Sequence, residues 1–173
     1  MVSTPLLQFG TSRFLQAHAD LFVSQAMAAG AALGPITVVQ TSGDAGRARR
    51  LSALADGFEV RLRGLEEGRA VDRSVRVTSV RRALSLGADP DEVQRIVTDE
   101  AQILLSNTAD GGFHPQPADG GRWFDPAMSF PAKLAHLMRP RFESGRPAPQ
   151  VMPTELVQGN GAVLRALVVP AAA

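Results

Sequence analysis

The stretch Leu6–His18 reads LLQFGTSRFLQAH and combines three local signals. Its first residues are apolar and predict a strand, Gly10 predicts a tight turn, and the residues from Phe14 onward follow the apolar period of a helix. A strand, a glycine turn and a helix in this order open a dinucleotide-binding unit, where backbone N–H groups and the helix N-terminus meet a pyrophosphate. The complete fingerprint has three glycines, however, and Ser12 and Leu15 stand at the other two positions.

The composition is typical of one soluble globular domain, with 173 residues, 45% hydrophobic and 20% charged. A net charge of +1 gives no reason to expect nucleic acid as a partner. The chain has no cysteine, which excludes disulfides and thiolate catalysis and fits a cytoplasmic protein. Its three histidines are too scattered for a metal motif. We find no signal peptide and no apolar run of roughly 20 residues that would span a membrane.

Predicted strands and helices alternate along the chain. Strands are predicted at Pro5–Phe9, Ile36–Gln40, Ala101–Leu105 and Gln150–Met152. Helices are predicted at Phe14–Ala29 (with Phe14, Ala17, Leu21, Phe22 and Ala26 on its apolar stripe), at about 45–55 and 90–98, and at 127–142 with interruptions at Pro131 and Pro140. Residues 111–125 are assigned to a surface loop, and residues 155–166 to a loop or helix.

Two alternating segments, Phe58–Arg63 and Ala70–Val77, are joined by an acidic loop around Glu66 and Glu67. They predict an antiparallel hairpin. The alternation of the other elements predicts a parallel sheet. The expected fold class is therefore α/β: a Rossmann-like, doubly wound, mostly parallel sheet with an antiparallel hairpin insertion.

Polar clusters follow three of the predicted strands, at Gly10–Arg13, Thr41–Asp44 and Ser106–Thr108. The carboxyl ends of parallel strands share one edge of a sheet, and ligands bind there. The candidate cofactor-binding residues are Gly10, Thr11, Ser12, Arg13, Phe14, Asp44, Asn107 and Thr108.

Several of these residues have an ordinary structural alternative. Arg13 pairs with phosphate or is a solvated surface residue, and Phe14 covers the cofactor or starts the helix core. Asp44 binds the adenosine ribose or caps a turn, and Asn107 with Thr108 contacts the nicotinamide side or forms an Asx-turn. His18 is expected to be a buried, hydrogen-bonded histidine rather than a catalytic base.

The second strand, Ile36–Gln40, is followed by Thr41 and Ser42, where NAD-binding folds place an acid for the adenosine ribose. The absence of that acid leaves NADP open as an alternative, with Arg47 meeting a 2′-phosphate.

The segment FGTSRFLQAH resembles the cofactor turn of the polyol-specific long-chain dehydrogenases, a family that includes mannitol dehydrogenase and fructuronate and tagaturonate reductases. The family pattern is close to G-x-G-x-F-x-R-A-H. Gly10, Phe14, Ala17 and His18 match it, whereas Ser12 replaces a glycine and Gln16 an arginine. Further blocks resemble the family in order: ITVVQTSG (36–43), LRGLEEGRAVD (62–72), LLSNTADGGF (104–113), SFPAKL (129–134) and PTELVQGNG (153–161), with Thr154 where cysteine is common.

This resemblance implies an oxidoreductase that moves a hydride between a nicotinamide cofactor, NAD by family habit, and a small-molecule sugar, polyol or sugar acid of the mannitol or hexuronate type. It also implies that Asn160, in the Asn-Gly pair, orients the substrate oxygen. The alternative for Asn160 is a common turn residue. Asp110 departs from a family position that is often Glu and is left unassigned.

Family members also carry a second, helical domain with a catalytic K-x5-N-x2-H cluster, which this chain lacks. Lys133 does not replace the catalytic lysine, because Arg139 and Phe142 stand at the positions of the Asn and His. We therefore expect residues 1–173 to be an NAD(P)-binding Rossmann-like domain, truncated or completed by a missing second domain. A non-catalytic NAD-binding fragment is the alternative. Without that domain, we expect partial exposure of the apolar edge around Val163, Leu164, Leu167 and Val168, and self-association.

Overall fold

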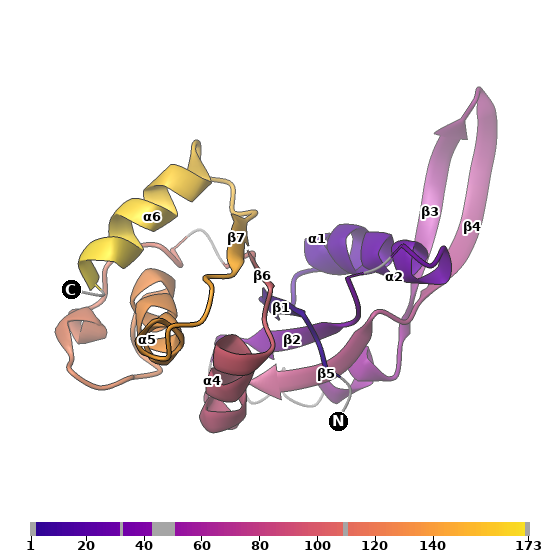
Figure 1. Ribbon diagram of the computed structural model, residues 1–173. Helices are drawn as coiled ribbons and strands as arrows, with labels where there is room; N and C mark the ends of the chain where they lie inside the picture. The colour runs from indigo at the N-terminus through magenta and orange to yellow at the C-terminus, as the bar shows by residue number, and fades with distance from the viewer. Residues whose placement is uncertain (1–2, 32, 43–50, 109–110, 172–173) are drawn as a thin grey trace.

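A parallel sheet forms the centre of the fold (Figure 1). The computed structural model describes residues 3–31, 33–42, 51–108 and 111–171. The sheet has five strands in the spatial order β5-β2-β1-β6-β7, and every neighbouring pair runs parallel. The strands are β1 Leu6–Phe9, β2 Ile36–Gln40, β5 Val80–Ser85, β6 Ile103–Ser106 and β7 Gln150–Pro153. Strand order reverses on either side of β1, as in a doubly wound fold. The predicted fold class is confirmed.

Side chains alternate between the two faces of the buried strands, so each face has its own core. On one face, Leu7 and Phe9 of β1 belong to the core that includes residues of three helices. On the other face, Leu6 packs in a smaller core with Leu51, which lies in the described part of the helix predicted at 45–55. The three helices of the first face are α4 Pro90–Asp99, α5 Phe130–Glu143 and α6 Asn160–Ala171.

The helix that follows β1 changes its winding partway along. It consists of α1 Arg13–Leu15, a π-helical segment Gln16–Asp20 and α2 Leu21–Ala28. A π segment rotates the residues after it relative to an unbroken α-helix. The predicted apolar stripe follows an unbroken α-helical period and is wrong in part: Phe14, before the π segment, and Phe22, after it, are 49% and 58% exposed.

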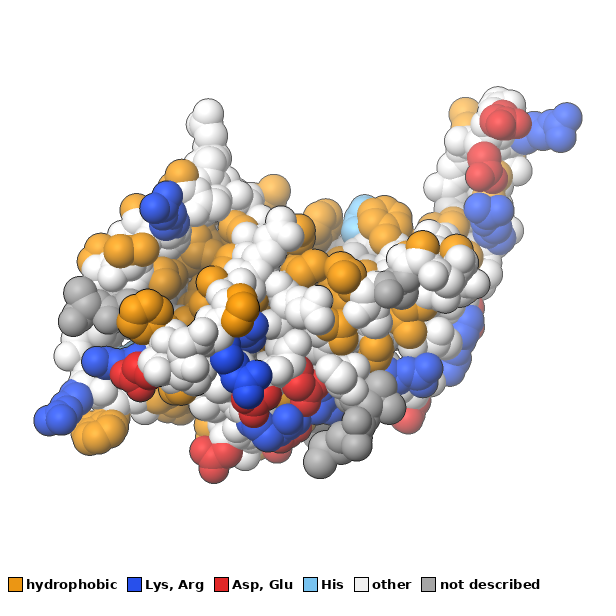
Figure 2. All heavy atoms as spheres, viewed as in Figure 1, with side chains coloured by type: hydrophobic (Ala, Val, Ile, Leu, Met, Phe, Trp, Pro, Cys, Tyr) orange, Lys and Arg blue, Asp and Glu red, His pale blue; other side chains and the backbone are white. Residues whose placement is uncertain are grey.

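The predicted hairpin is present and forms a separate two-stranded antiparallel sheet of β3 Phe58–Glu66 and β4 Arg69–Val77. Its turn residues, Glu67 and Gly68, both have positive φ angles, of 51° and 76°, as a tight hairpin turn requires. The hairpin extends away from the rest of the chain, and side chains of both charges line it (Figures 1 and 2).

Three other predictions are corrected or completed. Strand β5 has no counterpart among the predicted elements. Pro131 and Pro140 do not interrupt α5, since Pro131 lies in the first helical turn, where a missing N–H needs no partner. The segment predicted as loop or helix at residues 155–166 contains both, since α6 begins at Asn160 and runs to Ala171. Leu164 on α6 is only 3% exposed, so the expected exposure of the apolar edge is wrong there. Val163 is 37% exposed, as expected.

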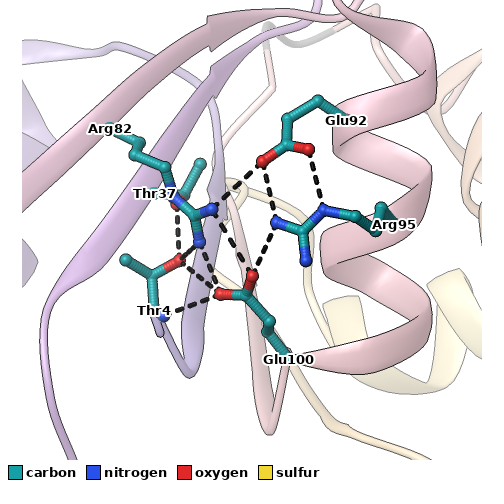
Figure 3. A network of polar contacts seen from close by, with 6 residues as sticks. All are labelled: Thr4, Thr37, Arg82, Glu92, Arg95 and Glu100. Atoms are coloured by element: carbon teal, nitrogen blue, oxygen red, sulfur yellow. Dashed lines mark hydrogen bonds and ion pairs between the residues drawn. The ribbon is translucent and has the colours of Figure 1, made fainter. Parts of the chain in front are cut away.

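An ion network fastens the amino-terminal edge of the sheet (Figure 3). Arg82 of β5 contacts Glu100 at 2.5 Å and Glu92 of α4 at 3.1 Å, and Arg95 contacts Glu100 at 2.7 Å. Thr4, just before β1, donates its backbone N–H to Glu100 at 2.9 Å. Burial acts to raise the pKa of Glu100, but hydrogen bonds from Arg82, Thr4 and Arg95 outweigh it and lower that pKa to about 2. The network therefore ties β1, β5 and α4 together.

Candidate functional site

The carboxyl edge of the sheet opens into a cleft of about 790 Å³. Its lining includes residues that follow β1, β2 and β6, so the three polar clusters predicted at strand ends do meet. The predicted residues that line it are Gly10, Thr11, Ser12, Arg13, Thr41, Ser42, Asn107 and Thr108. Phe14 and Asn160 are not among the lining residues, and Asp44, Arg47 and Asp110 lie outside the described residues.

Gly10 is required by the geometry of the turn. Its φ angle is +119°, and a Cβ atom there would lie 2.5 Å from the backbone oxygen of Asn107. Its N–H donates to the backbone oxygen of Val39 at 2.9 Å. The turn thus passes close to the ends of both β2 and β6, which a side chain would prevent.

Ser12, at the position of the second fingerprint glycine, caps the helix. Its Oγ accepts a hydrogen bond from the N–H of Leu15 at 3.2 Å. Gln16 reinforces the turn by donating from Nε2 to the backbone oxygen of Thr11 at 3.1 Å. The helix N-terminus at Arg13 therefore adjoins the cleft, and the positive end of a helix dipole favours an anion. Because α1 is only three residues long, this effect depends on the π segment and α2 continuing it.

Two aromatic residues in this helix differ from expectation. Phe14 is exposed and its ring stacks on His18, with centroids 4.6 Å apart, so it does not begin the helix core. His18 is also exposed, although Nδ1 forms the expected hydrogen bond, to the backbone oxygen of Phe14 at 2.8 Å. The prediction that His18 is buried is wrong, because His18 lies one turn after Phe14 on the same face of the helix and that face is exposed.

The edge formed by β6 and β7 is held by side chains that bond to the backbone. Asn107 donates from Nδ2 to the backbone oxygen of Thr154 at 2.9 Å. Thr108 donates its N–H to Glu155 Oε1 at 3.0 Å, and Ser106 donates its hydroxyl to Oε2 at 3.1 Å. Glu155 is buried and joins the ends of both strands. It was not predicted as a site residue, although it falls inside the family-like segment PTELVQGNG.

Asn160, the predicted substrate-orienting residue, begins α6. Its Nδ2 donates to the backbone oxygens of Pro153 at 2.9 Å and Glu155 at 3.2 Å. Both amide hydrogens are thus used to fix the loop between β7 and α6. Only Oδ1 is left to accept from a ligand, and the substrate-orienting role stays a prediction.

Lys133 is a cleft residue that the sequence motifs do not indicate. It lies in the first turns of α5, lines the cleft and is only 8% exposed. Its Nζ donates to the backbone oxygen of Thr41 at a long 3.5 Å. Burial lowers the pKa of Lys133, and the carboxylates of Asp119 and Asp125 oppose this only in part.

The described residues contain no group of three or more histidine, aspartate or glutamate side chains that could hold a metal ion. Across the same ranges, no helix combines the length and apolar character needed to cross a membrane.

The chain resembles a set of curated oxidoreductases over nearly its whole length. It is 27% identical over 166 residues to altronate oxidoreductase of Bacillus subtilis (strain 168), which covers 92% of this chain and 34% of that protein. It is 31% identical over 174 residues to altronate oxidoreductase of Escherichia coli O7:K1 (strain IAI39 / ExPEC), covering 94% and 35%. No family profile matches the chain.

Two solved structures share the fold. D-sorbitol dehydrogenase in substrate-free form aligns with a TM-score of 0.76 and 20% identity, over 99% of this chain and 38% of the other. Mannitol 2-dehydrogenase of Pseudomonas fluorescens, in a ternary complex with NAD and D-mannitol, aligns with a TM-score of 0.78 and 17% identity, over 98% and 37%. The chain spans about a third of the length of the curated relatives it matches. These matches, with the Gly10 turn and the ordered sequence blocks, show that the chain belongs to the polyol-specific long-chain dehydrogenase family, the family of mannitol dehydrogenase.

Proposed function

We propose that residues 1–173 form the nicotinamide-dinucleotide-binding domain of an oxidoreductase that moves a hydride between the cofactor and a sugar, polyol or sugar acid. One observation carries the proposal: the Gly10 turn, whose backbone approaches within contact distance of Asn107 at the mouth of the cleft. In dinucleotide-binding folds the first fingerprint glycine makes this tight turn, which aims backbone N–H groups and the helix N-terminus at the pyrophosphate. The related altronate oxidoreductases support the sugar-acid substrate class, and the NAD complex of the mannitol 2-dehydrogenase supports NAD as the cofactor.

In this proposal the residues of the chain bind and orient, and the cofactor supplies the hydride chemistry. Backbone N–H groups of the Gly10–Arg13 turn hold the pyrophosphate, with Arg13 as an exposed cation beside it. Asn107 and Thr108 fix the edge of the cleft that continues toward the nicotinamide. No residue of the chain is assigned to proton transfer. The ammonium group of Lys133, in α5, lies beside Thr41 after the end of β2, and the residues that follow Lys133 do not have the spacing of the family's catalytic cluster.

A second candidate is a dinucleotide-binding protein without turnover. The observation in its favour is the spacing after Lys133, which lacks the Asn and His of the family's catalytic cluster. The two candidates share a binding site and differ only in catalysis, so turnover by the chain is the observation that distinguishes them.

The test is a titration of the purified chain with NADH, followed by fluorescence, and assays for oxidation of mannitol and altronate with NAD. Backbone NMR should show NADH-induced shifts at Gly10, Thr41 and Asn107 and none at the hairpin tip around Gly68. Turnover by the purified chain would support the first candidate and contradict the second. Binding without turnover is expected of the second candidate, and of the first as well, because the first assigns proton transfer to no residue of the chain. Absence of binding at millimolar NADH and NADPH would contradict both.

A further inference from the structure

Lys133 is the only lysine in the chain, and its environment is unusual for that residue type. Lysine side chains are almost never fully buried unless they are paired. Lys133 is 8% exposed, yet among the described residues its Nζ has only the 3.5 Å contact to the Thr41 carbonyl. An ammonium group has three N–H donors, so most of its hydrogen-bonding capacity remains available on the cleft side.

The nearby carboxylates are engaged elsewhere. Asp119 accepts hydrogen bonds from the backbone N–H groups of Ser129 at 2.7 Å and Gln116 at 2.9 Å. Asp125 accepts one from the N–H of Ala127 at 2.7 Å. These two residues act on Lys133 only at a distance, and no ion pair links them to it within the described ranges. A purely structural role for the lysine is therefore poorly supported by its contacts.

The position of Lys133 indicates what it would bind. Its contact, Thr41, directly follows the last residue of β2. Dinucleotide folds recognise the adenosine ribose at this point, with an acid for the 2′-hydroxyl or a basic residue for a 2′-phosphate. Residues 40–42 read Gln-Thr-Ser and bring no carboxylate. Among the described residues, the charged donor at this place is Lys133 of α5, whereas Asp44 and Arg47, which the sequence also offers here, lie outside them.

We propose that Lys133 donates hydrogen bonds to oxygen atoms on the adenosine ribose of the bound dinucleotide, either its hydroxyls or a 2′-phosphate. This inference rests on the proposed function and assigns the adenosine end of the cleft, a role distinct from that of the family's catalytic lysine. An ammonium group at this point attracts a phosphate, where the usual carboxylate would repel it.

The test compares the affinities of wild type, Lys133→Met and Arg139→Gln for NADH and NADPH. Arg139 is a matched control, because it is an exposed cation on the same helix and pairs with Glu143 outside the cleft. Lys133→Met should weaken binding by about tenfold or more, the effect of losing one charge-assisted interaction. A loss confined to NADPH would identify the phosphate as the ligand of Lys133, and a similar loss for both would identify the ribose hydroxyls. Unchanged affinity for both would overturn the inference.

A misfolded variant would be recognised by its melting temperature. Lys133→Met keeps the aliphatic stem and removes a buried charge, so its melting temperature without nucleotide should equal or exceed that of wild type.

A second measurement needs no variant. Reductive methylation with ¹³C-formaldehyde labels only Lys133 and the α-amino group, and saturating NADH or NADPH should shield Lys133 while the α-amino group reacts as before. If NMR shows nucleotide binding but Lys133 is labelled equally with and without nucleotide, the inference is wrong. If wild type binds neither nucleotide, the proposed function itself fails.

Discussion

The two edges of the sheet differ in how many hydrogen-bond partners the protein gives to a shielded charged side chain. At the amino-terminal edge, the Glu100 carboxylate is bound by Arg82, Arg95 and the backbone of Thr4 (Figure 3). At the carboxyl edge, the Lys133 ammonium has, within the described ranges, one long contact to a carbonyl. Both are largely shielded from solvent, since the Glu100 side chain is 12% exposed and Lys133 as a whole residue is 8% exposed.

This contrast separates residues that hold the fold together from residues that are available to a ligand. A buried charge whose hydrogen bonds are all satisfied by the protein contributes to folding, and removing one partner leaves the others without compensation. A buried charge with unused donors gains its partners when a ligand arrives. Substitutions at the amino edge should therefore change stability with little effect on binding, and substitutions of cleft side chains should do the reverse.

The largest effect is expected for Gly10→Ala, which should be an exception to this contrast because it should lower both the stability of the fold and the affinity for nucleotide. The added Cβ would clash with the Asn107 oxygen, and alanine does not tolerate a φ of +119°. Backbone strain and overpacking together should lower the free energy of unfolding by about 4 kcal/mol. Urea denaturation and NADH titration are the measurements, and nucleotide binding should become undetectable.

Gly30→Ala is the matched control for that substitution. Gly30 also has a positive φ angle, of +73°, but a Cβ there would meet nothing within 4 Å. It should cost only about 1 kcal/mol, the price of the left-handed conformation, and leave nucleotide affinity unchanged. Equal losses for the two variants would show that the approach of Gly10 to Asn107 is unimportant.

Glu100→Gln is expected to have the next largest effect, and on stability alone. It leaves Arg82 and Arg95 short of a carboxylate and should lower the free energy of unfolding by about 2–3 kcal/mol at neutral pH, with nucleotide affinity unchanged. The pKa of Glu100 is lowered from 4.5 to about 2 in the folded state, so its contribution is complete above pH 4.5 and is lost as the pH falls through about 2. Wild type should therefore lose its advantage over the variant across that interval, as monitored by thermal melting. Parallel melting curves across the interval would contradict this assignment.

The fold was predictable because its elements carry strong local signals. Ile36–Gln40 is fully buried on both faces and reads as a continuous apolar and β-branched run, with boundaries that match β2. The hairpin strands alternate clearly, and Asp89-Pro90 marks the start of α4. Strand β5 was not predicted, because VRRALS contains two arginines and shows neither alternation nor an apolar run. Its Arg82 is acceptable in the sheet only because of Glu92 and Glu100, which are distant in sequence.

The candidate site was predictable only where one strand end determines it. Gly10, Thr41 and Asn107 follow strands directly, so the topology of a parallel sheet brings them together. Lys133 could not be predicted as a cleft residue, because its position beside Thr41 depends on how α5 packs across the sheet edge. No local pattern carries that information. Phe14 and His18 were misplaced because an apolar ring at a helical period was expected to be buried, whereas the two rings stack on each other at the surface.

The smallest of the three effects is expected for Asp20→Asn, which tests a buried carboxyl group that lies at neither edge of the sheet. Asp20 ends the π segment, is 0% exposed, and neither of its carboxylate oxygens forms a hydrogen bond of ordinary geometry within the described part of the chain. Burial raises its pKa from 3.8 to about 7, and the nearby Gln8 amide opposes this only in part.

The folded state binds the Asp20 proton more tightly than the unfolded state does. The free energy of unfolding of wild type should therefore fall as the pH rises from 3.8 to about 7. Asparagine cannot ionise, so the variant should lack this fall and should be more stable than wild type by about 1–2 kcal/mol near pH 8. Urea denaturation at several pH values measures the difference. Gln8, which lies near Asp20, donates to the backbone oxygen of Gly10 at 3.3 Å. Measuring NADH affinity over the same pH series therefore shows whether ionisation of Asp20 affects the Gly10 turn. If the free energies of unfolding of wild type and variant change with pH in the same way, the protein stabilises the charged form of Asp20. The Asp20 carboxylate would then resemble that of Glu100 at the amino-terminal edge, whose charge is compensated by the protein.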